Sequence, residues 1–274
     1  MWAIAGFLIA AAIGLPAVFI ICRRGSAHFE NHPWVLHDTA ELHVHVLGGL
    51  AGFAFTGVVL IVTFARERAG VVDPALDNVT AMFLTAFLWW IGGAFLISYI
   101  PHKETSGDLM PRIHFSLATH LEYRTVFLSW FALLPLLEAN GLGRLAPILY
   151  FLLPASLLCG SVLVAMATDG LGLLRFWETY ASAAVGVALT LAYAAIVTFG
   201  IPGARSAYSP LQMGLAIFCL NGGGFALAAL TPLAPRYAGV RRFFERHARR
   251  IVIADMQLTM LSLGFLWMAV VGVI

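Results

Sequence analysis

The sequence predicts an all-α fold, a polytopic membrane helix bundle with about eight transmembrane helices. Hydrophobic residues make up 61% of the 274 residues, only 11% are charged, and the mean hydropathy is +0.89, which is more apolar than a soluble domain requires. The apolar residues come in long runs, each about long enough to cross ~30 Å of hydrocarbon as a helix. None of these runs alternates with the period of two that a membrane β-barrel strand needs.

The apolar runs follow one another so closely that no separate soluble domain fits, and 1–274 is expected to form a single integral membrane domain. The expected spans are 2–22, 43–65, 80–100, 116–138, 145–168, 178–200, 210–234 and 251–273. The first span runs directly into Cys22-Arg23-Arg24 without a small-residue cleavage site, which favours a retained helix over a secretion signal.

Glycine clusters inside three spans are expected to let helix backbones approach closely, as small residues do in bilayers. They are Gly48, Gly49, Gly52 and Gly57 in the second span, Gly92 and Gly93 in the third, and Gly222 to Gly224 in the seventh.

Basic residues and histidines gather on one side of the expected bundle. With eight spans, the loops after spans one, three, five and seven share a side, and that side holds twelve of the sixteen basic residues and all nine histidines. Because positively charged loops favour the cytoplasm, we expect a bacterial cytoplasmic membrane protein with its Arg-rich loops cytoplasmic. The densest basic run, Arg241 to Arg250, is interpreted as a contact to anionic membrane lipid, an orientation signal or a docking patch for another subunit of a membrane complex, with no nucleic acid as partner.

The first histidine cluster lies at the mouth of the second span. If the helix begins before His37, then His37, Glu41 and His45 lie one turn apart on one stripe, while His43 points elsewhere. Two imidazoles and a carboxylate on one stripe fit a metal site, and a single imidazole fits the axial position of a haem. The alternative is a helix entry whose histidines are solvated among the lipid head groups.

The second cluster lies in the connection into the fourth span. It contains His102, Arg112, His114, His120, Glu122 and Arg124. Pro111 suits the first turn of a helix, which would place His120 and Arg124 on one face. A buried histidine beside Glu and Arg fits a quinone oxygen, a haem propionate or a metal, and the alternative is a salt-bridge cluster that anchors the helix end.

Two family resemblances accompany these clusters. The stretch Leu42-His43-Val-His45, followed by Leu-Gly-Gly-Leu-Ala-Gly, resembles the second helix of the haem–copper oxidase catalytic subunits, especially the nitric oxide reductase and cbb3-type branches. The stretch His120-Leu-Glu-Tyr-Arg124 resembles the helix with the first ligand of their second metal. Where that family has its other histidines, this chain has Met166, Ala167, Asp255 and Gln257. The resemblance therefore implies a reduced, accessory relative without a working binuclear centre.

The second resemblance is to the quinol-oxidising membrane anchors of molybdenum and iron–sulfur oxidoreductases, of the DmsC and NrfD kind, which have a similar length and about eight helices. The stretch Ser98-Tyr-Ile-Pro-His102, leading through Pro111-Arg112 to a polar helix entry, is similar to their Ser-x-x-His-Leu-Gly-x-Pro-x-Arg segment, without its His-Leu-Gly core.

Both resemblances imply a subunit of a respiratory or related electron-transfer complex, possessing a haem b or a quinone near one membrane face. In this hypothesis His43 or His45, with His120 opposite and His102 near, binds the haem or the quinone head, and Arg124 or Arg112 supplies positive charge. The resemblances imply a subunit of an oxidoreductase and do not say whether the chain itself carries the catalytic activity.

Two alternatives stay open. One is a metal-dependent membrane enzyme whose ligands are His37, Glu41, His45, His114 and His120. The other is a proton or ion transporter or channel in which the histidines titrate along a water-filled path. The transporter is less favoured, because the spans hold few polar residues at their centres and no inverted repeat is visible.

Overall fold

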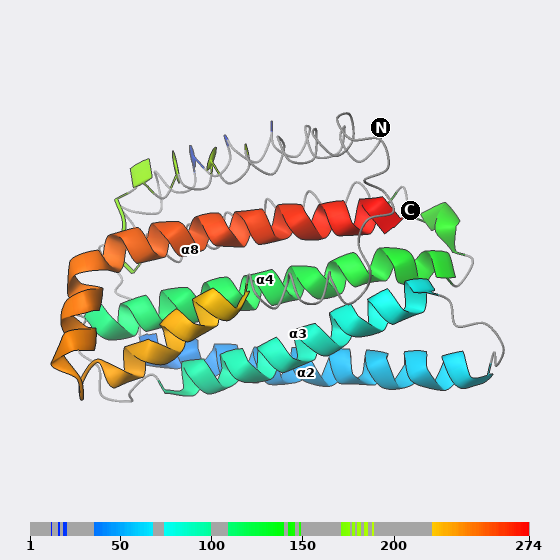
Figure 1. Ribbon diagram of the computed structural model, residues 1–274, viewed down its shortest axis with the longest axis horizontal. Coiled ribbons are helices and arrows are strands. Elements are labelled where there is room, and N and C mark those ends of the chain that lie inside the picture. Colours follow the sequence, from blue (N-terminus) through cyan, green and yellow to red (C-terminus); the bar gives the residue numbers. More distant parts are fainter. Residues whose placement is uncertain are drawn as a thin grey trace.

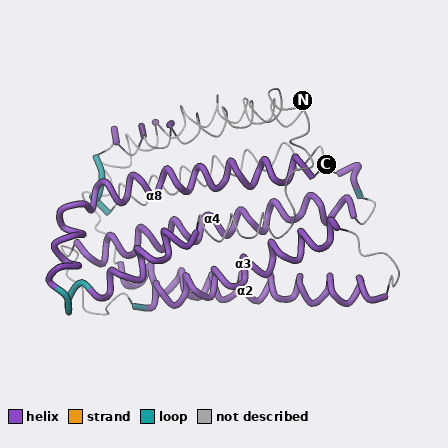
Figure 2. Tube along the Cα trace, viewed as in Figure 1, coloured by secondary structure: helices purple, strands orange, loops and turns teal. Residues whose placement is uncertain are grey.

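The computed structural model describes residues 36–67, 74–99, 109–139, 142–145, 171–175 and 221–273, with isolated positions between 12 and 20 and between 148 and 188. These residues are helical with short turns and contain no β-strand (Figure 2), which confirms the predicted all-α class for this part of the chain. The long helices are α2 (Leu36–Glu67), α3 (Pro74–Ser98), α4 (Leu109–Ala139) and α8 (Ala238–Val273). Residues 221–230 are also helical, and η1 (Gly143–Leu145) and η3 (Thr231–Leu233) are short 3-10 turns.

The predicted spans 43–65, 80–100, 116–138 and 251–273 correspond to α2, α3, α4 and α8. By length and composition, two stretches among the described residues are able to cross a membrane, Ala40–Thr63 in α2 and Val79–Ser98 in α3. Of the other predicted spans, 210–234 is described from 221 onward, whereas 2–22, 145–168 and 178–200 lie outside the described residues except at isolated positions.

The long helices lie side by side, with α3 packed against α2 and α4, and α4 packed against α8 (Figure 1). Consecutive helices alternate in direction, as short connections require. One end of the bundle therefore gathers the start of α2, the end of α3, the start of α4 and the start of α8. The first predicted histidine cluster lies at the start of α2, and the described part of the second extends from the start of α4 to its middle.

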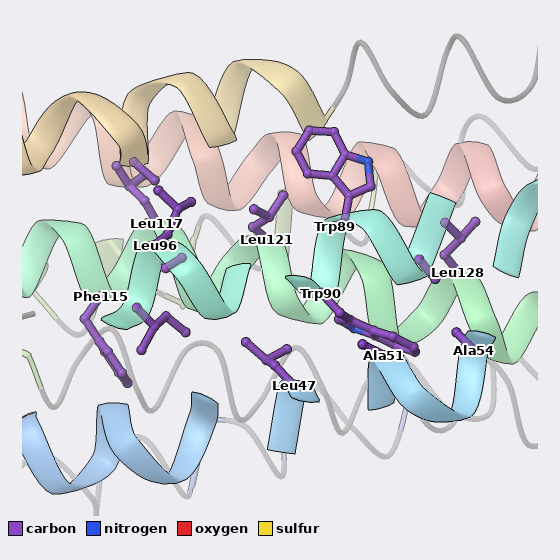
Figure 3. Packing of buried hydrophobic residues seen from close by; sticks show 14 of the residues in the cluster. Leu47, Ala51, Ala54, Trp89, Trp90, Leu96, Phe115, Leu117, Leu121 and Leu128 are labelled. Carbon is purple, nitrogen blue, oxygen red and sulfur yellow. The ribbon is translucent and has the colours of Figure 1, made fainter. Parts of the chain in front are cut away.

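Two adjacent tryptophans on α3 fill the space on different sides of that helix (Figure 3). Trp90, only 1% exposed, lies toward Leu47 and Ala51 of α2, whereas Trp89 packs edge-on against Phe225 with ring centroids 5.3 Å apart. Successive residues of a helix point about 100° apart, so neighbours in sequence reach different partners. The two indoles thereby join α3 to α2 and to the 221–230 helix.

The outer faces of α2 and α3 are apolar, the reverse of what a soluble helix pair shows. Only 22% of Ala40–Thr63 and 44% of Val79–Ser98 are buried within the chain. The exposed large apolar side chains on these helices include Leu42, Val46, Phe53, Phe55, Val59, Leu60, Val62, Leu84, Leu88, Ile91 and Phe95. Because contact with water costs about 25 cal/mol per Å² of apolar surface, these faces favour a lipid environment.

Only some of the clustered glycines lie where two helices pack closely, which is the role expected from the sequence. A methyl group at Gly92 would lie 3.0 Å from the Phe225 ring, so this glycine permits close packing of α3 on the 221–230 helix. Gly48, Gly49 and Gly52 are exposed, and a methyl group at any of them would meet nothing within 4 Å. The prediction of close helix contact at these three positions was wrong, because α2 packs on α3 through its other face.

We predict opposite effects for leucine at Gly92 and at Gly48. Gly92→Leu should lower the free energy of unfolding by about 1–3 kcal/mol, because the side chain overlaps the Phe225 ring. Gly48→Leu should be neutral or stabilising by up to about 0.8 kcal/mol, because leucine has the higher helix propensity and meets open space. Thermal unfolding in detergent, followed by circular dichroism, measures both; equal destabilisation would contradict the packing described for Gly92.

Candidate functional site

The first half of α4 carries ionisable side chains that face different neighbours. His120 and Arg124 are one turn apart and share a stripe, as the sequence predicts for a helix with Pro111 in its first turn. Glu122 points about 200° away from His120, because each helical residue turns by about 100°. These groups lie between the start of α4 and its middle, with Arg124 at the midpoint of the 31-residue helix.

The most enclosed group is the buried triad, which we define as His120, Arg124 and Asp255. All three side chains are 1% exposed or less. His120 Nδ1 donates to Asp255 Oδ2 at 2.8 Å, and Arg124 Nη2 donates to Asp255 Oδ1 at 2.7 Å. One carboxylate on α8 thus accepts hydrogen bonds from two side chains on α4.

The charges of the buried triad balance when His120 is neutral, because Asp255 carries one negative charge and Arg124 one positive charge. Taking each ion out of water costs several kcal/mol, and only well-formed hydrogen bonds offset that cost. The Arg124 Nε atom also donates to the backbone oxygen of His120 at 3.3 Å. The contact is therefore specific in geometry, and loss of Asp255 or Arg124 would leave the other charge buried and unbalanced.

Gly224 makes room for the buried triad. A methyl group there would lie 2.6 Å from Arg124 Nη2 and 2.9 Å from Asp255 Oδ1. At the neighbouring Gly223 a methyl group would meet nothing within 4 Å. Of the glycines in this run, Gly224 is the one that a larger residue would bring into conflict with charged groups.

His114 joins three segments of the chain. Its Nε2 atom lies against the backbone oxygen of Leu96 at the end of α3. Its Nδ1 atom lies 3.0 Å from the backbone oxygen of Ala228 and also contacts the hydroxyl of Thr231. Both ring nitrogens are therefore engaged with oxygen atoms from α3 and from the 221–233 segment, and His114 is 3% exposed. We interpret His114 as a structural residue that holds α4 against α3 and the 221–233 segment.

On the opposite side of α4, Glu122 faces α2. His43 Nε2 lies 3.6 Å from Glu122 Oε2, and the His43 ring packs edge-on against Phe115 with centroids 5.2 Å apart. The His43 side chain is 24% exposed and the Glu122 side chain 11%. Glu122 Oε2 is buried and accepts no hydrogen bond from the described part of the chain. We call His43 and Glu122 the α2/α4 pair.

The remaining residues of the first cluster do not join this pair. The helix begins at Leu36, before His37, as the predicted stripe requires. His45 and Glu41 are exposed, and His45 Nδ1 donates to the backbone oxygen of Glu41 at 2.8 Å. His43 points toward α4 instead. The side chain of His37 lies outside the described residues.

Arg112 stands apart from the buried triad. Its Nη1 atom donates to the backbone oxygen of Leu171 at 2.9 Å, next to Gly172, which has a φ of 64°. Arg112 thereby ties the start of α4 to the 171–175 turn. His102 lies outside the described residues.

Of the five predicted metal ligands, the structure describes the side chains of four, and it does not bring these four together. Glu41 and His45 are exposed on α2, His114 is tied to α3 and the 221–233 segment, and His120 belongs to the buried triad. Within the described ranges, no group of three or more His, Cys, Asp or Glu side chains has the arrangement of a metal site.

Asp255 and Gly224 belong to the site, although sequence reasoning did not join them to His120 and Arg124. The sequence feature that indicates this site is Asp255 itself, because a carboxylate in an apolar span is costly and requires a partner. The sequence also did not pair Glu122 with His43, which is 79 positions away.

Comparison with known protein families, with curated proteins and with solved structures found no significant match. The two family resemblances inferred from sequence motifs therefore stay predictions.

Removal of the carboxylate from the buried triad should be far more harmful than removal of an exposed one from the same helix. We predict that Asp255→Ala lowers the free energy of unfolding by about 3–5 kcal/mol, because Arg124 remains buried without its counter-ion. The matched control Glu245→Ala breaks the exposed Arg241–Glu245 pair and should cost less than about 1 kcal/mol. Thermal unfolding in detergent compares the two, and similar losses would refute the importance of the triad.

Gly224→Ala should destabilise the protein by about 1–3 kcal/mol, because its methyl group collides with Arg124 and Asp255. Gly223→Ala is the control and should be neutral or slightly stabilising, because that position is open and alanine has the higher helix propensity. Denaturant unfolding in mixed micelles measures the difference. A Gly224→Ala protein as stable as the control would show that the triad tolerates a side chain there.

Proposed function

We propose that this chain is an integral membrane subunit of a respiratory or related electron-transfer complex, and that it binds the head group of a membrane quinone at the α2/α4 pair. The observation that carries the proposal is the buried Glu122 Oε2 atom, which accepts no hydrogen bond from the described residues and lies 3.6 Å from His43 Nε2. A buried polar atom without a partner is costly, and a ligand that donates a hydrogen bond removes that cost.

The membrane setting is supported by the apolar outer faces of α2 and α3 and by the two helices that are long and apolar enough to cross a bilayer. We extend this to the eight-span bundle expected from the apolar runs of the whole sequence, placed in a bacterial cytoplasmic membrane with the Arg-rich loops on the cytoplasmic side.

The chemistry of the pair fits a quinone head group in either redox state. A quinone carbonyl accepts a hydrogen bond, which the His43 imidazole can donate, and a quinol hydroxyl donates one, which the Glu122 carboxylate can accept. Quinones supply reversible two-electron chemistry coupled to protons. Since His43 is 24% exposed at the α2/α4 face, a flat ring arriving through the lipid would meet this pair beside the Phe115 ring.

The buried triad supports this site through the orientation of α4. With His120 and Arg124 held against α8, the helix presents Glu122 to α2. We assign the triad a positioning role, because its three side chains are almost fully enclosed and the atoms of Asp255 are already hydrogen-bonded.

A quinone suits this arrangement better than a haem. Axial ligation requires an imidazole nitrogen directed at the iron, whereas His43 Nε2 is directed at the Glu122 carboxylate. The haem hypothesis predicts a Soret band that is lost in His43→Phe, which an optical spectrum of the purified protein tests directly.

We predict that His43→Phe and Glu122→Gln each weaken quinone binding by about tenfold or more, because His43→Phe removes the hydrogen-bond donor and Glu122→Gln replaces a charged acceptor with a weaker neutral one. The matched control is His45→Gln, because His45 is two positions away and, among the described residues, hydrogen-bonds only within its own helix. Binding of a decyl-tailed ubiquinone and of a menaquinone analogue to the full chain in nanodiscs is measured by quenching of tryptophan fluorescence. Equal affinity in all four proteins, or no binding by the wild type, would overturn the proposal.

A further inference from the structure

The start of α8 runs across the end of the bundle before the helix turns to lie along it (Figure 1). One face of this segment is anchored in the protein. Phe244 is fully buried in the hydrophobic core and Ile251 is 8% exposed. The opposite and lateral faces are exposed and carry most of the arginines of the Arg241 to Arg250 run.

Phe243, Arg246 and Arg250 form one lateral stripe of this segment, at helical spacings of three and four residues. We call these residues the arginine stripe. Phe243 is 47% exposed and its ring packs against His247, with centroids 5.4 Å apart. Arg246 and Arg250 are exposed, and neither has an ion pair with the parts of the chain that the structure describes.

The neighbouring arginines differ in this respect. Arg241 donates to Glu245 at 2.7 Å on the other side of the helix, and Arg249 pairs with Glu178. Glu245 and Glu178 are therefore engaged away from the stripe, which within the described part of the chain retains two positive charges beside an exposed aromatic ring.

The position of the arginine stripe along the chain indicates which part of the bilayer surrounds it. The last predicted span begins at residue 251, so Arg250 and Arg246 lie within the turns just before the hydrocarbon, at the level of the lipid head groups. A phenylalanine on an interfacial helix inserts its ring at the boundary between head groups and acyl chains, and guanidinium groups form paired hydrogen bonds with phosphate oxygens. An acidic soluble protein would neutralise the charges but would not account for an exposed phenylalanine beside them.

We propose that the arginine stripe is a binding site for the phosphodiester head group of an anionic phospholipid, with Arg246 and Arg250 on the phosphate and Phe243 against the glycerol and upper acyl chain. The proposal rests on the chain lying in a membrane and is independent of the quinone site.

The test is binding of phosphatidylglycerol and phosphatidylcholine with identical acyl chains to the full chain in micelles, measured by native mass spectrometry. The variant is Arg246→Gln/Arg250→Gln. The matched control is Arg241→Gln/Arg242→Gln, which removes the same charge from the same helix outside the stripe. We expect the stripe variant to bind phosphatidylglycerol on the order of twentyfold more weakly, since each basic side chain near an anionic surface contributes roughly fivefold. The control should lose less than about threefold, and phosphatidylcholine should bind weakly to all three proteins.

Equal losses in the stripe variant and the control would overturn the site in favour of a diffuse surface charge. Equal binding of phosphatidylcholine and phosphatidylglycerol would overturn recognition of the anionic head group. Inorganic phosphate is added as a competitor, and complete displacement of the lipid would assign the stripe to free phosphate instead. Phe243→Ala should also weaken the lipid without affecting inorganic phosphate. All substituted positions are exposed, so unchanged thermal unfolding confirms that the variants are folded.

Discussion

The carboxylate of Asp255 is the constraint on which the orientation of α4 depends. It holds His120 and Arg124, which share one stripe of α4, against α8. Once that stripe faces α8, helical geometry directs Glu122 toward the other side of α4, where His43 of α2 lies. This buried contact between α4 and α8, together with the His114 contacts to α3 and the 221–233 segment, fixes the rotation of α4 and, with it, the position of the α2/α4 pair.

The described bundle separates its polar chemistry from its apolar packing. The helices meet mainly through apolar side chains such as Trp90, Leu47 and Leu121, whereas the ionisable groups of the triad and of the α2/α4 pair occupy a few positions on α2, α4 and α8. Burial of these groups is graded: the triad is enclosed, the α2/α4 pair is partly open, and the arginine stripe is exposed. This gradient agrees with the proposed roles, which are a positioning group for the triad, a quinone site for the pair and a lipid head-group site for the stripe.

Local patterns in the sequence were sufficient for several features. The apolar runs predicted the helices α2, α3, α4 and α8, because lipid requires every backbone group to be satisfied within its own helix. Pro111 marked the first turn of α4, and the four-residue spacing of His120 and Arg124 placed them on one face. The glycines at 48, 49 and 52 show the limit of such reasoning, because small residues permit a close contact but do not determine that a helix comes near.

By itself the sequence determined which segments are helices and which residues share a face, because both depend on the fixed geometry of a single helix. Only the tertiary structure decided which neighbour each face meets. His120 and Asp255 are 135 positions apart, and no spacing along the chain encodes that their side chains touch. The same holds for His43 and Glu122. The sequence does not distinguish His43 from its exposed neighbour His45, and only the position of α4 beside α2 decides that His43 faces Glu122.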